Sequence, residues 1–314
     1  MDYLLLLIGL GALLLSGDLL VRGGVSLARH FKISTLVVGM TVVSLGTSAP
    51  ELVVSLQAVF SGHADFAIGT VIGSNISNIG LVLGLTVIVM PMLVNSRSVF
   101  VDWPIMMGAT VLFYLFIRNG TLVHQEGMIF IFLLAGFLVF SIWNSRRNDG
   151  KDGKVVLKPK YSLLISLLII VVSSVGLKFG AEWLVKGASG IAKNFNVSDH
   201  VISVSIVAFG TSVPELATSL IAAIKKESDI SIGNIIGSNL FNILGILGIT
   251  AAVKSIDVND QVLNFDIWFL GGICVLLLLM MLPAKKAKIR RFEGAILVVS
   301  YIVYISLVFS GKLG

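Results

Sequence analysis

Two short motifs, each present twice, combine oxygen-bearing side chains with glycine and proline. The stretch 46–51, Gly-Thr-Ser-Ala-Pro-Glu, reappears at 210–215 as Gly-Thr-Ser-Val-Pro-Glu. At the same offset the stretch 73–78, Gly-Ser-Asn-Ile-Ser-Asn, reappears at 237–242 as Gly-Ser-Asn-Leu-Phe-Asn. The first motif places a carboxylate and a helix-breaking proline inside an otherwise apolar run. Ionisable groups in such runs are costly and usually functional, so the motifs indicate a site.

The oxygen-bearing side chains are spaced to share helical faces. Thr47 and Glu51 are four residues apart, as are Ser44 and Ser48, and residues four apart lie on one side of a helix. The corresponding candidates elsewhere are Thr211, Ser212 and Glu215 in the second copy, and the pairs Ser74 with Asn78 and Ser238 with Asn242 on the segments that follow. If the two copies face each other, these hydroxyl and amide oxygens converge with two carboxylates.

The prolines and the ligand types indicate which ions such a site would hold. Pro50 has no amide hydrogen, so the carbonyl of Gly46 loses its helical donor, and Pro214 has the same effect on Gly210. Within a membrane a freed carbonyl needs a partner, and a hard cation is one. Because the motifs contain neither His nor Cys, they favour sodium, calcium or, less well, magnesium over zinc or copper. One Ca²⁺ or two Na⁺ would neutralise the two glutamates.

The composition places these motifs in a membrane protein. Hydrophobic residues make up 56% of the chain, charged residues 13%, and the mean hydropathy is +0.99, whereas soluble domains are about 25% charged. The single cysteine, Cys274, excludes a disulfide within the chain. We interpret the apolar stretch after Met1 as a retained first helix, because it lacks the basic residues and cleavage site of a signal peptide.

Ten apolar segments, each about 17–25 residues long, are predicted to cross the bilayer. They lie near 3–21, 34–61, 66–93, 99–117, 127–144, 161–183, 198–224, 229–253, 265–283 and 293–310. The polar stretch 145–160 is the predicted linker between a first membrane repeat, 1–144, and a second, 161–314. Five segments per repeat is an odd number, so the second copy must be inverted, and inverted repeats place substrate sites at the membrane midplane. The predicted fold is therefore all-α, with two inverted five-helix repeats.

The distribution of positive charge predicts the orientation. Of the 23 Lys and Arg residues, 17 fall in the loops that follow segments one, three, five, seven and nine. By the positive-inside rule, both termini lie outside the cell and the linker 145–160 is cytoplasmic. The predicted location is the cell membrane, as a multi-pass protein. Asp18 and Glu182, near the ends of equivalent helices, are interpreted as solvated or anchoring charges.

Together these motifs resemble the alpha repeats of the cation/calcium exchanger superfamily, and in particular its prokaryotic sodium/calcium exchangers. The resemblance covers nearly the whole chain, because four motif copies occur in the right order and spacing. It implies that Glu51 and Glu215 are central carboxylates shared by calcium and sodium. It further implies oxygen ligands from Thr47, Ser48, Thr211, Ser212, Ser74 and Ser238, backbone carbonyls around Ser44 and Ala208, and Asn78 and Asn242 at the centre. The first and sixth helices would slide across a rigid core.

One position departs from the pattern of the family. Relatives often carry an aspartate at one of the two central asparagine positions, whereas here both Asn78 and Asn242 are asparagine. In the family a carboxylate at the position of Asn242 is associated with potassium co-transport. The departure therefore favours a potassium-independent exchanger. The preferred hypothesis for the whole chain is a secondary antiporter that exports Ca²⁺ against inward Na⁺.

The alternatives to a sodium/calcium exchanger are a Ca²⁺/H⁺ antiporter, an intramembrane enzyme and a passive channel. A Ca²⁺/H⁺ antiporter on the same fold is the nearest alternative, because glutamates can carry protons as well as sodium. An intramembrane enzyme would need a nucleophile or a metal-ligand set that the repeats do not offer, and a passive channel fits inverted repeats less well. We expect no enzyme activity, no cofactor beyond the transported Ca²⁺ and Na⁺, and no nucleic-acid partner. The sequence does not define an oligomeric state, and a monomer is compatible with the site.

Overall fold

The computed structural model describes residues 1–62, 64–149, 158–195, 208–282 and 288–310. Within these ranges nine helices are long and apolar enough to cross a membrane, and Val213–Ile224 is a shorter apolar helix. The first part of the predicted seventh segment, 198–207, lies outside the described residues. The prediction of an all-α membrane protein is confirmed, and its ten-segment count is close.

Several of the membrane segments are composite, because short π-helical stretches join α-helices end to end. The first repeat contains α1 (Asp2–Phe31), α2 (Thr35–Val38), η1 (Gly39–Val43), α3 (Ser44–Phe60), α4 (Asp65–Ser77), η2 (Asn78–Leu83), α5 (Gly84–Val89), η3 (Ser98–Asp102), α6 (Trp103–Ile117) and α7 (His124–Asp149). The second contains α8 (Leu163–Asn194), α10 (Ala208–Thr211), α11 (Val213–Ile224), α12 (Ser228–Leu240), η5 (Phe241–Leu247), α13 (Gly248–Val253), η6 (Val262–Asp266), α14 (Ile267–Met281) and α15 (Arg291–Phe309).

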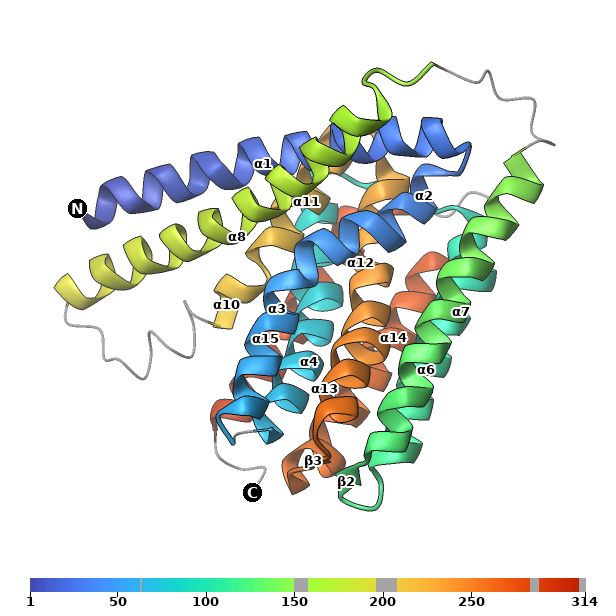
Figure 1. The fold of residues 1–314 in the computed structure, drawn as a ribbon. Helices are drawn as coiled ribbons and strands as arrows, with labels where there is room; N and C mark the ends of the chain where they lie inside the picture. Colours follow the sequence, from blue (N-terminus) through green and yellow to red (C-terminus); the bar gives the residue numbers. More distant parts are fainter. Residues whose placement is uncertain (63, 150–157, 196–207, 283–287, 311–314) are drawn as a thin grey trace.

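Two short strand pairs tie the repeats together outside the helices. Strand β1 (Met92–Leu93) pairs antiparallel with β4 (Lys288–Ile289), and β2 (Thr121–Leu122) pairs antiparallel with β3 (Ile256–Asp257). Each pair takes one strand from each repeat. Figure 1 shows β2 and β3 at the lower end of the bundle, close to where α7 begins.

Helices α1 and α8 lie side by side and antiparallel along one flank of the bundle (Figure 1). Their contact shows the symmetry of the repeats. Gly23 of α1 lies against Ser166 and Ile170 of α8, and the repeat-related Gly187 of α8 lies against Asp2 and Leu6 of α1. A Cβ atom at Gly187 would lie 2.5 Å from the backbone nitrogen of Leu6, so only glycine permits this approach. The inverted repeat predicted from the sequence is confirmed.

The first and sixth helices are longer than predicted. Helix α1 continues to Phe31 and α8 to Asn194, whereas the sequence suggested ends near 21 and 183. The residues 22–31, interpreted as a loop because they are polar, continue the helix and pack against α2 and α8. Long basic side chains permit this because their charged ends can reach the interface while the stem covers apolar surface.

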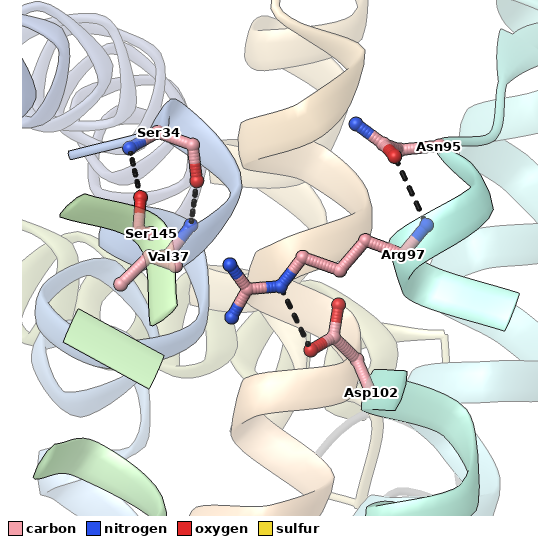
Figure 2. A network of polar contacts seen from close by, with 6 residues as sticks. All are labelled: Ser34, Val37, Asn95, Arg97, Asp102 and Ser145. Carbon is pink, nitrogen blue, oxygen red and sulfur yellow. Dashed lines mark hydrogen bonds and ion pairs between the residues drawn. The ribbon is translucent and has the colours of Figure 1, made fainter. Parts of the chain in front are cut away.

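A polar network closes the end of the bundle where α2 begins and α7 ends. Figure 2 shows the amide of Ser34 donating to Ser145 Oγ of α7, at 2.8 Å, and the Arg97 side chain reaching Asp102. The two atoms of that ion pair, Arg97 Nε and Asp102 Oδ1, are 3.5 Å apart. The Asp102 side chain is fully buried and that of Arg97 is 16% exposed. Each charge is therefore stabilised mainly by the other and little by water.

Replacing Asp102 with alanine should therefore destabilise the protein by about 3 kcal/mol, because a mostly buried guanidinium loses its counter-charge. The double variant Arg97→Met/Asp102→Leu removes both charges and should recover most of that loss. Thermal unfolding in detergent measures both, with Asp260→Ala, at an exposed position in the helical turn before η6, as the control. Equal melting temperatures for Asp102→Ala and Asp260→Ala would contradict the assignment.

Candidate cation-binding site

The two motif glutamates lie inside the bundle on helices from different repeats. Glu51 of α3 is 3% exposed and Glu215 of α11 is 1% exposed. Ser48 Oγ donates to Glu215 Oε1 at 3.0 Å, a bond between the repeats. Within the described chain, the Oε2 atoms of both glutamates are buried without a hydrogen-bond partner. Buried oxygens that lack a donor are costly, so both carboxylates are suited to receive a cation.

A second group of contacts joins α3 to α12. Thr47 Oγ1 lies 3.5 Å from Ser238 Oγ and donates to Asn234 Oδ1 at 3.2 Å. All three side chains are fully buried. Thr47 and Ser238 were predicted site residues, whereas Asn234 was not. Its repeat-related position is Thr70, so no repeated motif marks it in the sequence.

The asparagines of the second motif meet between α4 and the α12–η5 segment. Asn242 Nδ2 donates to Asn75 Oδ1 at 3.0 Å, and Asn75 Nδ2 donates to the carbonyl of Asn239 at 3.3 Å. The Oδ1 atoms of Asn78 and Asn242 are buried and have no partner in the described residues. Asn78 begins η2, and Asn242 lies in η5. Such π-helical turns are frequent at functional sites.

The remaining predicted ligands are Ser44, Ser74, Thr211, Ser212 and Ala208, and they would offer either a side-chain or a backbone oxygen. The Ser44 hydroxyl donates to the Met40 carbonyl at 2.8 Å. The Ser44 carbonyl lies 3.2 Å from Thr47 Oγ1 and is the alternative acceptor to Asn234 Oδ1 for the one Thr47 proton. That the Ser44 carbonyl binds a cation stays a prediction. Ser74 is 5% exposed and Ser212 is 1% exposed. The backbone of Ala208 begins α10, which contains Thr211.

The two prolines do not have the same effect on their helices. Both prolines were predicted to interrupt a helix. For Pro50 this prediction is wrong, because Pro50 lies inside a continuous α3. Pro214 instead lies in the first turn of α11, directly after the break at Ser212. A membrane helix can continue through a proline when neighbouring groups satisfy the freed carbonyl, and α3 is packed by both α4 and α12.

A cleft of about 310 Å³ leads to the site from one side. Glu51, Thr211 and the two motif prolines lie at its inner part, and Lys178 and Glu182 of α8 lie along its wall. Gln57 of α3 and Thr70 of α4 also line the cleft. The cleft therefore lies toward the turn that joins these two helices. That turn is at the opposite end of α3 from the Ser34–Ser145 contact, so the cleft opens away from the end of α7.

On the opposite side α1 closes over the site. Gly17 of α1 packs against Ala217 and Ile221 of α11. The repeat-related residues Ala181, Val53 and Gln57 line the open cleft instead. The structure therefore shows the same interface twice, once closed between α1 and α11 and once open between α8 and α3.

An ion pair strengthens the closed interface. The Asp18 carboxylate pairs with Lys225 at the end of α11, and Arg22 Nε lies 2.6 Å from its Oδ2 atom. Asp18 therefore acts as an anchoring charge, as interpreted from the sequence, and it anchors α1 to α11. The repeat-related position of Lys225 is Ser61, so the sequence repeat gave no signal for this contact.

The donor set is that of a hard-cation site. In the part of the chain that the structure describes, no group of three or more His, Cys, Asp and Glu side chains could hold a metal ion. Two carboxylates are instead surrounded by hydroxyl, amide and carbonyl oxygens, which suit sodium and calcium. Inverted repeats with such a site beside a cleft are typical of a secondary membrane transporter.

The comparisons with known proteins agree with this class. The model of the sodium/calcium exchanger protein family matches residues 1–143 and 165–310. The chain is 37% identical over 310 residues to the putative antiporter CaxA of Alkalimonas amylolytica, covering 97% of each chain. It is 28% identical over 354 residues to the sodium/calcium exchanger MaX1 of Methanosarcina acetivorans, covering 98% of each.

A solved structure gives the same result in three dimensions. The sodium/calcium exchanger from Methanococcus jannaschii matches with a TM-score of 0.81 and 32% identity, covering 97% of both chains. The chain therefore belongs to the sodium/calcium exchanger family, which is a family of transporters.

The closed interface generates a prediction. Lys225→Met removes the cation that holds Asp18 and should weaken the closed interface by about 1 kcal/mol, about fivefold in population, because the pair is only half-buried. A cysteine at Ala217, in a Cys274→Ala background, should then react about fivefold faster with a membrane-impermeant thiol reagent. Lys226→Met removes a neighbouring charge outside the pair and should leave the rate unchanged. Equal rates in the two variants would show that the ion pair does not hold the interface.

Proposed function

We propose that this protein is an antiporter that exchanges Na⁺ for Ca²⁺ by alternating access. The observation that carries the proposal is the pair of buried glutamates, one from each inverted repeat, with Glu51 lining a cleft beside α8. Solved and named relatives that are sodium/calcium exchangers support the ions. One Ca²⁺ or two Na⁺ offset the same two negative charges, so the two loads compete for one site.

The roles of the individual ligands follow from their positions and chemistry. Glu51 and Glu215 are the carboxylates that both ions share. The neutral oxygens come from side chains of Thr47, Ser48, Ser74, Asn78, Thr211, Ser212, Ser238 and Asn242, and from the backbone carbonyls of Ser44 and Ala208. Ser48 now donates to Glu215, and a cation would take over that carboxylate oxygen while the serine turns its own oxygen to the ion.

Alternation exchanges the two repeat-related interfaces. Sliding α1 and α8 together would separate Gly17 from α11 and bring Ala181 against α3. The glycine-lined contact between α1 and α8 lets the two helices move as one unit. With the linker in the cytoplasm, as the positive-inside rule indicates, the open cleft faces outside and the protein exports Ca²⁺ across the cell membrane.

The Glu51→Gln variant tests the proposal. In sodium-loaded proteoliposomes, an outward sodium gradient should drive ⁴⁵Ca²⁺ uptake by the wild type, and the variant should show only background uptake because one of the two shared charges is missing. Glu182→Gln removes a carboxylate from the wall of the same cleft and should retain sodium-driven uptake. Absence of calcium uptake by a folded wild type would make the proposed ions wrong.

The same assay separates the Ca²⁺/H⁺ alternative. A proton gradient without sodium should drive no uptake, because the neutral oxygens at Thr47, Ser238 and Asn242 serve a metal cation and a bare proton needs no such shell. Uptake driven by protons alone would assign the protein to the alternative.

Potassium should not be required. Asn78 and Asn242 both present amides, so the site has no third carboxylate to balance an additional cation. Replacing potassium with choline on both sides should leave sodium-driven ⁴⁵Ca²⁺ uptake unchanged. A loss of uptake on removing potassium, restored by adding it back, would contradict potassium independence.

A further inference from the structure

The buried chain of side chains behind Thr47 occurs in only one of the two repeats. Thr47 Oγ1 donates to Asn234 Oδ1 at 3.2 Å, and Asn234 Nδ2 donates to Ser219 Oγ at 3.0 Å. Ser231 then donates to the Ser219 carbonyl at 2.9 Å. All four side chains are fully buried, so the arrangement is built into the core between α3, α11 and α12.

The repeat-related residues do not form this chain. Thr70 stands where Asn234 would be, and its hydroxyl donates to the Phe66 carbonyl of its own helix at 2.8 Å. Ser55, the counterpart of Ser219, is buried, and its Oγ has no hydrogen-bond partner in the described residues. The difference is specific to the Thr47 half of the site.

Building on the proposed exchange function, we propose that Asn234 is a positioning residue that makes Thr47 a ligand for a monovalent cation. A hydroxyl has one proton and two lone pairs. When the Thr47 proton points to Asn234 Oδ1, both lone pairs are available to an ion. The Ser44 carbonyl, which otherwise accepts that proton at 3.2 Å, is released to the ion as well.

Ser219 faces the nitrogen end of the Asn234 amide, opposite Thr47. Because Asn234 Nδ2 donates to Ser219 Oγ, the oxygen of the amide is directed toward Thr47. A reversed amide would present an N–H group, and Thr47 would accept from it with one lone pair. The threonine proton would then turn to the Ser44 carbonyl at 3.2 Å, so both that carbonyl and one lone pair of Thr47 would be lost to the ion. Asn234 and Ser219 together therefore orient the dipole of the Thr47 hydroxyl.

This orientation affects sodium more than calcium. The two carboxylates supply most of the binding energy of a divalent ion, since Coulomb attraction scales with its charge. A monovalent ion depends on neutral dipoles for a larger share of its binding energy. Asn234 is thus a specificity-determining residue for the sodium-loaded state.

The test measures half-saturating sodium and calcium concentrations for exchange, and direct ²²Na⁺ binding to purified protein. Asn234→Leu, of similar size, should raise half-saturating sodium about tenfold, as loss of a ligand-orienting partner does at metal sites. Half-saturating calcium should change less than about threefold by the charge argument. Asn234→Asp keeps an acceptor for Thr47 and should not weaken sodium binding, which a purely structural role of the amide does not predict.

A double-mutant cycle identifies the route of the effect. Thr47→Val removes the oriented hydroxyl, so adding Asn234→Leu to it should cause no further loss of sodium affinity. Ser219→Ala should weaken sodium binding in the same direction as Asn234→Leu. Thr70→Val, at the repeat-related position, is the matched control and should leave half-saturating sodium unchanged.

The experiments distinguish a failure of the Asn234 proposal from a failure of the proposed exchange function. Sodium-driven calcium flux by the wild type tests the function, and only the shift in sodium affinity tests the role of Asn234. Unchanged sodium affinity in Asn234→Leu, or a loss additive with that of Thr47→Val, would overturn the inference. If Asn234→Leu does not fold, an unchanged sodium affinity in Ser219→Ala overturns it instead.

Discussion

The structure depends on keeping two negative charges inside a membrane bundle. Glu51 and Glu215 are almost completely buried, and their charges repel each other across the site. At the low effective dielectric of such a site this repulsion and the loss of hydration are large, so a cation load is needed before the helices can close over the charges. The same electrostatic cost that makes the empty site unfavourable couples one ion's exit to another's entry.

The inverted repeat is a direct way of meeting this constraint. One carboxylate from each copy reaches the same plane from opposite directions, and the helix that covers one copy is related by symmetry to the helix that uncovers the other. The contact of Gly17 with Ala217 and Ile221, and the open positions Ala181, Val53 and Gln57, are therefore two stages of one interface. A single conformation already contains the contact surfaces of the opposite one, in accord with two states of similar energy.

The inverted architecture and the repeated motifs could be predicted from the sequence, because both repeats carry the same pattern. The odd number of segments in each repeat predicted inversion. The spacing of Thr47 and Glu51 placed their side chains on one side of a helix, because helical periodicity is a local property. Features without a repeated partner were missed. Asn234 and Lys225 have contacts distant in sequence, and their counterparts Thr70 and Ser61 have different chemistry. The π-helical turns and the uninterrupted α3 depend on packing by neighbouring helices, which a local pattern does not contain.

An exchanger whose two states differ in free energy needs asymmetry between its repeats, and these unrepeated features provide it. With identical repeats, the outward and inward states would have equal free energy, and the two ends of the site would bind each ion equally. The Asp18–Lys225 pair stabilises only one closed interface, and the break before α11 gives the second copy a shorter helix than α3. The Asn234 chain orients only one of the two threonines. Symmetry therefore provides the pathway between the states, and the departures from it make the free energies of those states unequal.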